Sequence, residues 1–64
     1  MPDRTFTAAE KQAAAEREVS YRKRVYGRRV AEQKMTQKLA DEQIAIMEAI
    51  AKDYAELAAK ERLI

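Results

Sequence analysis

The stretch from Met35 to Tyr54, MTQKLADEQIAIMEAIAKDY, decides the fold because it predicts a single helix with an unusually broad apolar face. Thr36 is a suitable N-cap, and an apolar residue directly before it can pin the entry of the chain. At about 100° per residue, large apolar side chains recur on one line. They are Leu39, Ile46, Ile50, Leu57 and Ile64. Further apolar residues widen this line on one side, namely Ala40, Ile44, Met47, Ala51, Tyr54 and Ala58.

A second helix is predicted before this stretch. Thr7-Ala8-Ala9-Glu10 is a capping box, in which the first and last side chains satisfy each other's backbone N–H groups. The apolar stripe of this helix is narrow, and its first half consists of small residues. It contains Ala8, Ala15, Val19, Tyr26 and Val30. Gly27 lies inside the helix, where we expect a kink or a close approach of another element rather than a break.

The chain therefore predicts one all-α domain over residues 1–64. We expect helices at about 7–33 and 37–62, joined by a turn at about 34–36 into an antiparallel hairpin. The narrow stripe of the first helix cannot cover the broad face of the second. The simplest remedy is a second copy, which would give a homodimeric four-helix bundle. The rival remedy is a helix of another protein laid on the same face.

The expected dimer or partner interface lies on the second helix. It comprises Leu39, Gln43, Ile46, Met47, Ile50, Tyr54 and Leu57. Gln43 is the polar member of this set, and a polar residue at such a position can fix register or oligomeric state. The alternative is that Gln43 lies at the rim and reaches solvent. Tyr26 and Tyr54 are expected at the edge of the core, and Tyr21 is expected to be exposed.

Composition excludes several classes of function. The 64 residues include no Cys and no His, so the commonest metal ligands and the commonest general base are missing. The carboxylates have no acid/base partner at helical spacing, and no calcium-loop spacing occurs. We expect no enzyme activity, cofactor, metal or small-molecule substrate. The first residues lack a signal peptide, and no apolar run is long enough to span a membrane, so we expect a soluble cytoplasmic protein with no membrane partner.

Charge is distributed unevenly along the chain. Residues 1–16, 17–34 and 35–64 carry net charges of −1, +5 and −2. Within the basic block, Arg17, Arg24 and Arg28 share one helix face that points away from the apolar stripe. This basic row is either a solvated face, a surface for an acidic protein, or a phosphate-binding surface for nucleic acid.

Part of the chain resembles a group of small, uncharacterised bacterial and prophage proteins with helical hairpins. The likeness lies between Tyr21 and Tyr54. It rests on Arg24-Val25-Tyr26, Val30, Met35-Thr36, Ala40-Asp41, Ile44, Met47-Glu48-Ala49-Ile50 and Asp53-Tyr54. Members of that group often have Pro where Gly27 stands and Gly where Gln33 stands, so the first helix here is expected to run further or to turn more tightly. The resemblance implies a mobile-element setting and no known activity.

The sequence thus favours a small protein–protein interaction protein, accessory or inhibitory, whose partner is itself and/or a host or phage protein. The alternative is a nucleic-acid-binding protein that uses the basic row. A third possibility is a structural subunit of a larger particle.

Overall fold

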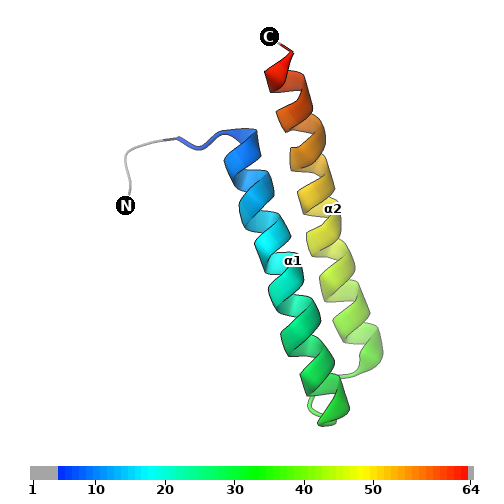
Figure 1. Ribbon diagram of the computed structural model, residues 1–64. Coiled ribbons are helices and arrows are strands. Elements are labelled where there is room, and N and C mark those ends of the chain that lie inside the picture. The colour runs from blue at the N-terminus through cyan, green and yellow to red at the C-terminus, as the bar shows by residue number, and fades with distance from the viewer. Residues whose placement is uncertain (1–4, 64) are drawn as a thin grey trace.

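Two long helices lie side by side and antiparallel in the computed structural model, which describes residues 5–63. Helix α1 spans Ala8–Ala31 and helix α2 spans Gln37–Arg62. The connection between them lies at one end of the hairpin, and the described ends of the chain lie at the other (Figure 1). The all-helical hairpin expected from the sequence is confirmed. Residues 1–4 of the leader, and Ile64 on the predicted apolar line, lie outside the described residues.

Helix α1 begins with the predicted capping box. The Thr7 hydroxyl accepts a hydrogen bond of 3.1 Å from the Glu10 N–H, and the Glu10 carboxylate accepts one of 3.1 Å from the Thr7 N–H. A second carboxylate, from Glu61 near the end of α2, accepts from the Ala8 N–H at 3.3 Å. Acceptors at a helix N-terminus satisfy N–H groups that have no partner within the helix. The start of α1 is therefore tied to the end of α2.

The turn between the helices depends on Gln33, which adopts a left-handed backbone with φ of 61°. The Gln33 N–H donates a hydrogen bond of 3.0 Å to the carbonyl of Val30. The Lys34 N–H donates one of 2.8 Å to the carbonyl of Arg29. These two bonds close the end of the helix in a Schellman motif. Helix α1 accordingly ends at Ala31 and does not run on to residue 33. Glycine usually fills this position, and a side chain there costs about 1 kcal/mol.

Helix α2 begins at its predicted cap, because the Thr36 hydroxyl accepts from the Leu39 N–H at 3.1 Å. Gly27 meets our expectation only in part, because the helix is not broken there but no other element approaches. Helix α1 continues through it, and no atom lies within 4 Å of the position that a Cβ would occupy. The expected close approach of another element at Gly27 is therefore wrong.

The core between the helices consists of alanine. The buried residues among those described are Ala8 and Ala15 of α1 and Ala40, Ala51 and Ala58 of α2. We call these five residues the alanine seam. Val19, Tyr26 and Val30 continue the α1 side of the seam and are half-buried. Alanine side chains end at Cβ, so the two helix backbones can approach closely along the seam, as they do at contacts between small residues.

The seam predicts a sharp difference between two neighbouring alanines of α1. Ala15→Leu inserts a branched side chain where α2 packs closely, so it should lower the free energy of unfolding by about 1–3 kcal/mol. Ala13→Leu changes an exposed alanine two residues away and should stay within about 0.5 kcal/mol of the parent chain. Urea denaturation followed by circular dichroism measures both. Equal stability of the two variants would contradict close packing at the seam.

Candidate functional site

Four large apolar residues of α2 form an exposed line, which we call the Leu/Ile row. They are Leu39, Ile46, Ile50 and Leu57, and their side chains are 45%, 55%, 37% and 47% exposed. Successive spacings of seven, four and seven residues keep them within about 20° of one line on an α-helix. The row extends over about 27 Å at 1.5 Å per residue. This row of exposed apolar side chains is the candidate interaction surface of the hairpin.

The position of the alanine seam explains why the row is exposed. Ala40, Ala51 and Ala58 lie about 100–120° around α2 from the row. Since α1 packs on these alanines, it covers that side of the broad face, where Ile44, Met47 and Tyr54 are half-buried, and leaves the Leu/Ile row exposed. The sequence predicts that a single hairpin leaves Ile46, Met47, Ile50 or Leu57 partly exposed. Ile46, Ile50 and Leu57 are exposed, and Met47 is half-buried.

The remaining residues of the predicted interface lie between the row and the seam. Gln43, Met47 and Tyr54 are half-buried there, and side chains from α1 reach two of these positions. The Lys11 ammonium lies 5.5 Å from the centre of the Tyr54 ring, within the range of a cation–π interaction. Tyr26 and Tyr54 are both half-buried, as expected for core-edge residues, and Tyr21 is exposed.

Arg22 makes the principal polar contact between the helices on this side. Its Nη1 donates a 2.8 Å hydrogen bond to the backbone carbonyl of Gln43, and its Nε pairs with the Glu18 carboxylate at 2.9 Å. If the basic block of residues 17–34 is only a solvated face, the sequence predicts that Arg22 pairs with an acidic residue of α2 or of a second subunit. The acidic partner instead lies one turn earlier on α1. A bond from a side chain to a mid-helix carbonyl has no sequence signal, so this anchor could not be predicted.

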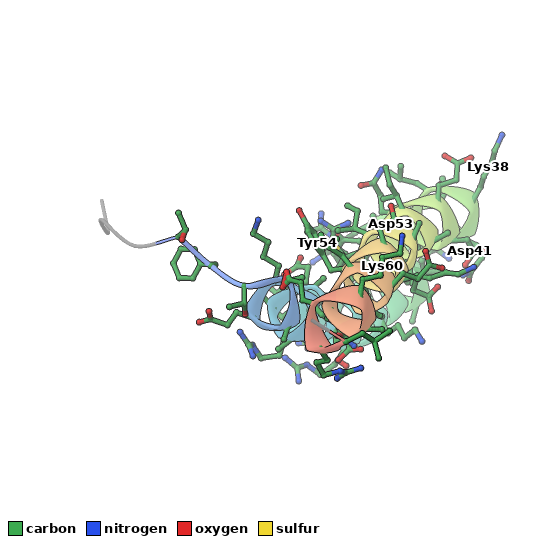
Figure 2. The ribbon with its side chains drawn as sticks, turned by 90° about the horizontal axis from the view of Figure 1, so that it is seen from above. Lys38, Asp41, Asp53, Tyr54 and Lys60 are labelled. Atoms are coloured by element: carbon green, nitrogen blue, oxygen red, sulfur yellow. The ribbon has the colours of Figure 1, made fainter. Side chains whose placement is uncertain are left out.

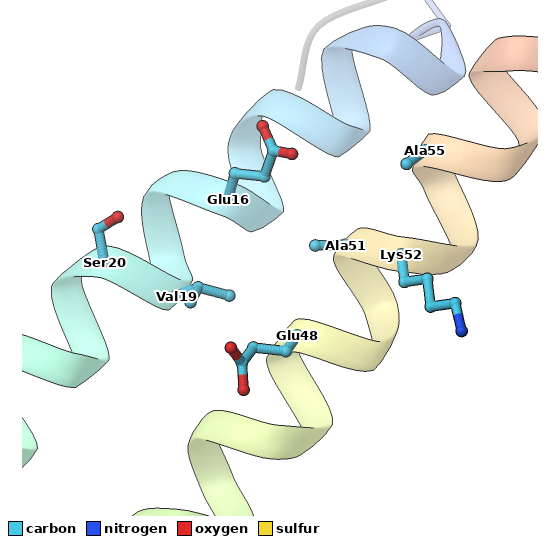
Figure 3. A pocket seen from close by; sticks show the side chains of 7 residues that line it. All are labelled: Glu16, Val19, Ser20, Glu48, Ala51, Lys52 and Ala55. Carbon is cyan, nitrogen blue, oxygen red and sulfur yellow. The ribbon is translucent and has the colours of Figure 1, made fainter.

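The opposite side of the hairpin carries a shallow groove at mid-length (Figure 3). It is lined by Glu16, Val19, Ser20, Glu48, Ala51, Lys52 and Ala55. Val19 and Ala51 point toward each other across the groove, and Lys52 points away from α1. Glu48 pairs with Lys23 of α1 at 3.4 Å, and both side chains are more than half exposed. An exposed ion pair of this kind contributes at most about 1 kcal/mol.

The outer side of α2 is turned away from α1 and carries mainly charged residues. Lys38 and Lys60 project from it into solvent (Figure 2). Asp53 is exposed on the same helix, close to the Leu/Ile row in helical angle. The apolar row is therefore bordered by polar side chains, an arrangement common at protein interfaces.

The basic row of α1 lies away from the seam, as predicted. Arg17, Arg24 and Arg28 are all exposed. The Arg24 guanidinium lies 5.8 Å from the centre of the Tyr21 ring, so one aromatic and one basic side chain share this surface. A shallow depression beside them also includes Arg29 and Lys34.

Within residues 5–63, no group of three or more acidic side chains is placed to hold a metal ion. Neither of the two helices described is long and apolar enough to cross a membrane. No protein-family model, curated protein or solved structure matches this chain. The resemblance of its central stretch to small prophage proteins stays a prediction from the sequence.

Proposed function

We propose that this chain is a small protein–protein interaction protein that acts as a homodimer of helical hairpins packed into a four-helix bundle. The Leu/Ile row is the observation that carries this proposal. In the described hairpin the buried residues are alanines, while four Leu and Ile side chains remain about half exposed. A small domain with so little buried apolar surface usually gains stability from oligomerisation.

The energetic gain from covering the row is substantial. Complete burial of a Leu or Ile side chain contributes about 1.5–3 kcal/mol relative to exposure, so a half-exposed side chain forgoes roughly half of this. A second copy would recover that contribution at four positions on each hairpin. Gln43, Met47 and Tyr54 would then lie inside or at the edge of the bundle.

The biological setting of the proposal comes from the sequence. The similarity between residues 21–54 and small prophage proteins supports an accessory or inhibitory role in the bacterial cytoplasm, directed at a host or phage protein. In the dimer, such a target would be bound by the outer faces, including the basic row of α1.

Self-association is tested by replacing one residue of the row. The parent chain should sediment at twice its mass of 7.4 kDa at micromolar concentration. Ile46→Glu buries a charge in the proposed interface and should weaken the dimer at least about 100-fold. Ala45→Glu adds the same charge at an exposed neighbour pointing elsewhere, and should leave the dimer intact. A parent chain that sediments as a monomer, or equal effects of both variants, would contradict the proposal.

The second candidate function is nucleic-acid binding by the basic row, and the position of the Arg24 guanidinium 5.8 Å from the centre of the Tyr21 ring favours it. This surface lies opposite the seam, so it stays accessible when the Leu/Ile row is covered. Phosphate contacts by Arg and Lys give binding that weakens steeply with salt. An exposed aromatic ring beside them could stack on a base.

Two matched double variants test this candidate. Arg24→Glu/Arg28→Glu should abolish a DNA or RNA mobility shift at physiological ionic strength. Lys38→Glu/Lys60→Glu changes the net charge equally on the outer side of α2 and should preserve most of the binding. Absence of any shift at low salt, or equal loss in both variants, would exclude a specific role for the basic row.

A further inference from the structure

The Leu/Ile row is symmetric about the middle of α2. Leu39 and Leu57 lie nine residues before and after Glu48, and Ile46 and Ile50 lie two residues before and after it. Residues at equivalent distances are therefore identical in type, and all four are exposed to a similar degree. The row has the same chemistry and the same spacing when it is followed in either direction along the helix.

A surface with this property can pair with a reversed copy of itself. A two-fold axis perpendicular to α2, at the level of Glu48, would place Leu39 opposite Leu57 of the second copy and Ile46 opposite Ile50. Two-fold interfaces require such self-complementarity, because the same patch is used by both subunits. A parallel arrangement would match the row equally well, so a second observation is needed to choose between the two.

The distribution of charge along the hairpin distinguishes the antiparallel from the parallel arrangement. At the level of Glu48, the hairpin divides into a turn half, residues 21–47, and an open half, residues 5–20 and 48–63. The turn half contains seven basic and three acidic residues, a net charge of +4. The open half contains five basic and seven acidic residues, a net charge of −2. The contact between Lys23 and Glu48 lies at this boundary.

From these two observations, we propose that the occupant of the Leu/Ile row is a second copy of this chain docked antiparallel. This inference rests on the proposed homodimer and specifies its arrangement. Antiparallel docking lays each basic turn half beside the acidic open half of the other copy, which is electrostatically complementary. Parallel docking would place two halves of charge +4 side by side, within about one Debye length at physiological salt.

The same axis also places the two α1 helices next to each other. Helix α1 packs on α2 about 100° around from the row. The axis is perpendicular both to α2 and to the direction in which the row points. It therefore places the α1 helices of both copies on the same side of the paired α2 helices. The four helices then form a square bundle in which each helix has two neighbours. The Glu18–Arg22 pair of each copy lies on the flank of α1 that faces the other copy.

Disulfide trapping tests the direction of docking, since the chain contains no Cys. Leu39→Cys and Leu57→Cys are prepared as full-length chains, one of them labelled with ¹⁵N so that their dimers differ in mass. Circular dichroism and sedimentation confirm that each variant is helical and dimeric. Each is then oxidised alone, and the two are also mixed, allowed to exchange subunits and oxidised together. Intact mass spectrometry identifies the disulfide-linked species.

Antiparallel docking predicts that the mixed disulfide exceeds each homodimeric disulfide at least about fivefold, because two copies of residue 39 would be about 27 Å apart. Efficient homodimeric disulfides would overturn antiparallel docking while leaving self-association intact. Antiparallel docking would also be overturned by a dimer that forms no mixed disulfide, neither between Leu39→Cys and Leu57→Cys nor between Ile46→Cys and Ile50→Cys. A parent chain that sediments as a monomer would instead overturn the proposed function itself.

Discussion

The packing of α1 on α2 along the alanine seam determines how the other side chains of this hairpin are placed. Ala8 and Ala15 of one helix and Ala40, Ala51 and Ala58 of the other are buried, and no larger side chain among residues 5–63 is. Contacts between such small residues favour a short distance between helix axes. The preference of α1 for these small residues determines which part of the broad apolar face of α2 meets α1. The Leu/Ile row then points sideways and stays exposed to the surroundings.

The polar contacts of the hairpin differ between the side that carries the Leu/Ile row and the opposite side. Arg22 and Lys11 reach from α1 onto the side of α2 that carries the row, where they contact Gln43 and Tyr54. They secure α1 beside the row without covering it. On the other side, the exposed pair between Lys23 and Glu48 borders a shallow groove. The two sides of the hairpin therefore differ in chemistry, and one of them has the character of an interface.

The sequence predicted the helices and their antiparallel packing, because caps and apolar periodicity are local features. The capping box at Thr7 and the cap at Thr36 are both present. The surplus of apolar surface on α2 was also predictable, since it follows from comparing the widths of two stripes. It was harder to predict from the sequence which part of that surface would pack against α1. Hydrophobicity alone ranks Ile46 above Ala51 as a core residue, whereas packing distance favours alanine.

Other features had no sequence signal or a misleading one. Gln33 closes α1 in a left-handed conformation that glycine usually supplies, so its role could be recognised only from the backbone. Gly27 suggested a close approach, but the space beside it is open. Arg22 bonds to a backbone carbonyl rather than to an acidic residue of α2. Each of these depends on tertiary geometry and not on the pattern of residue types.

We propose that a second copy stabilises the folded hairpin by covering the Leu/Ile row. Thermal unfolding followed by circular dichroism over a hundredfold range of protein concentration tests this most directly. If folding is coupled to association, the midpoint temperature must rise with concentration by mass action. We therefore expect a steady rise of several degrees across that range. A midpoint that does not change with concentration would show that the hairpin folds alone, without stabilisation by a second copy.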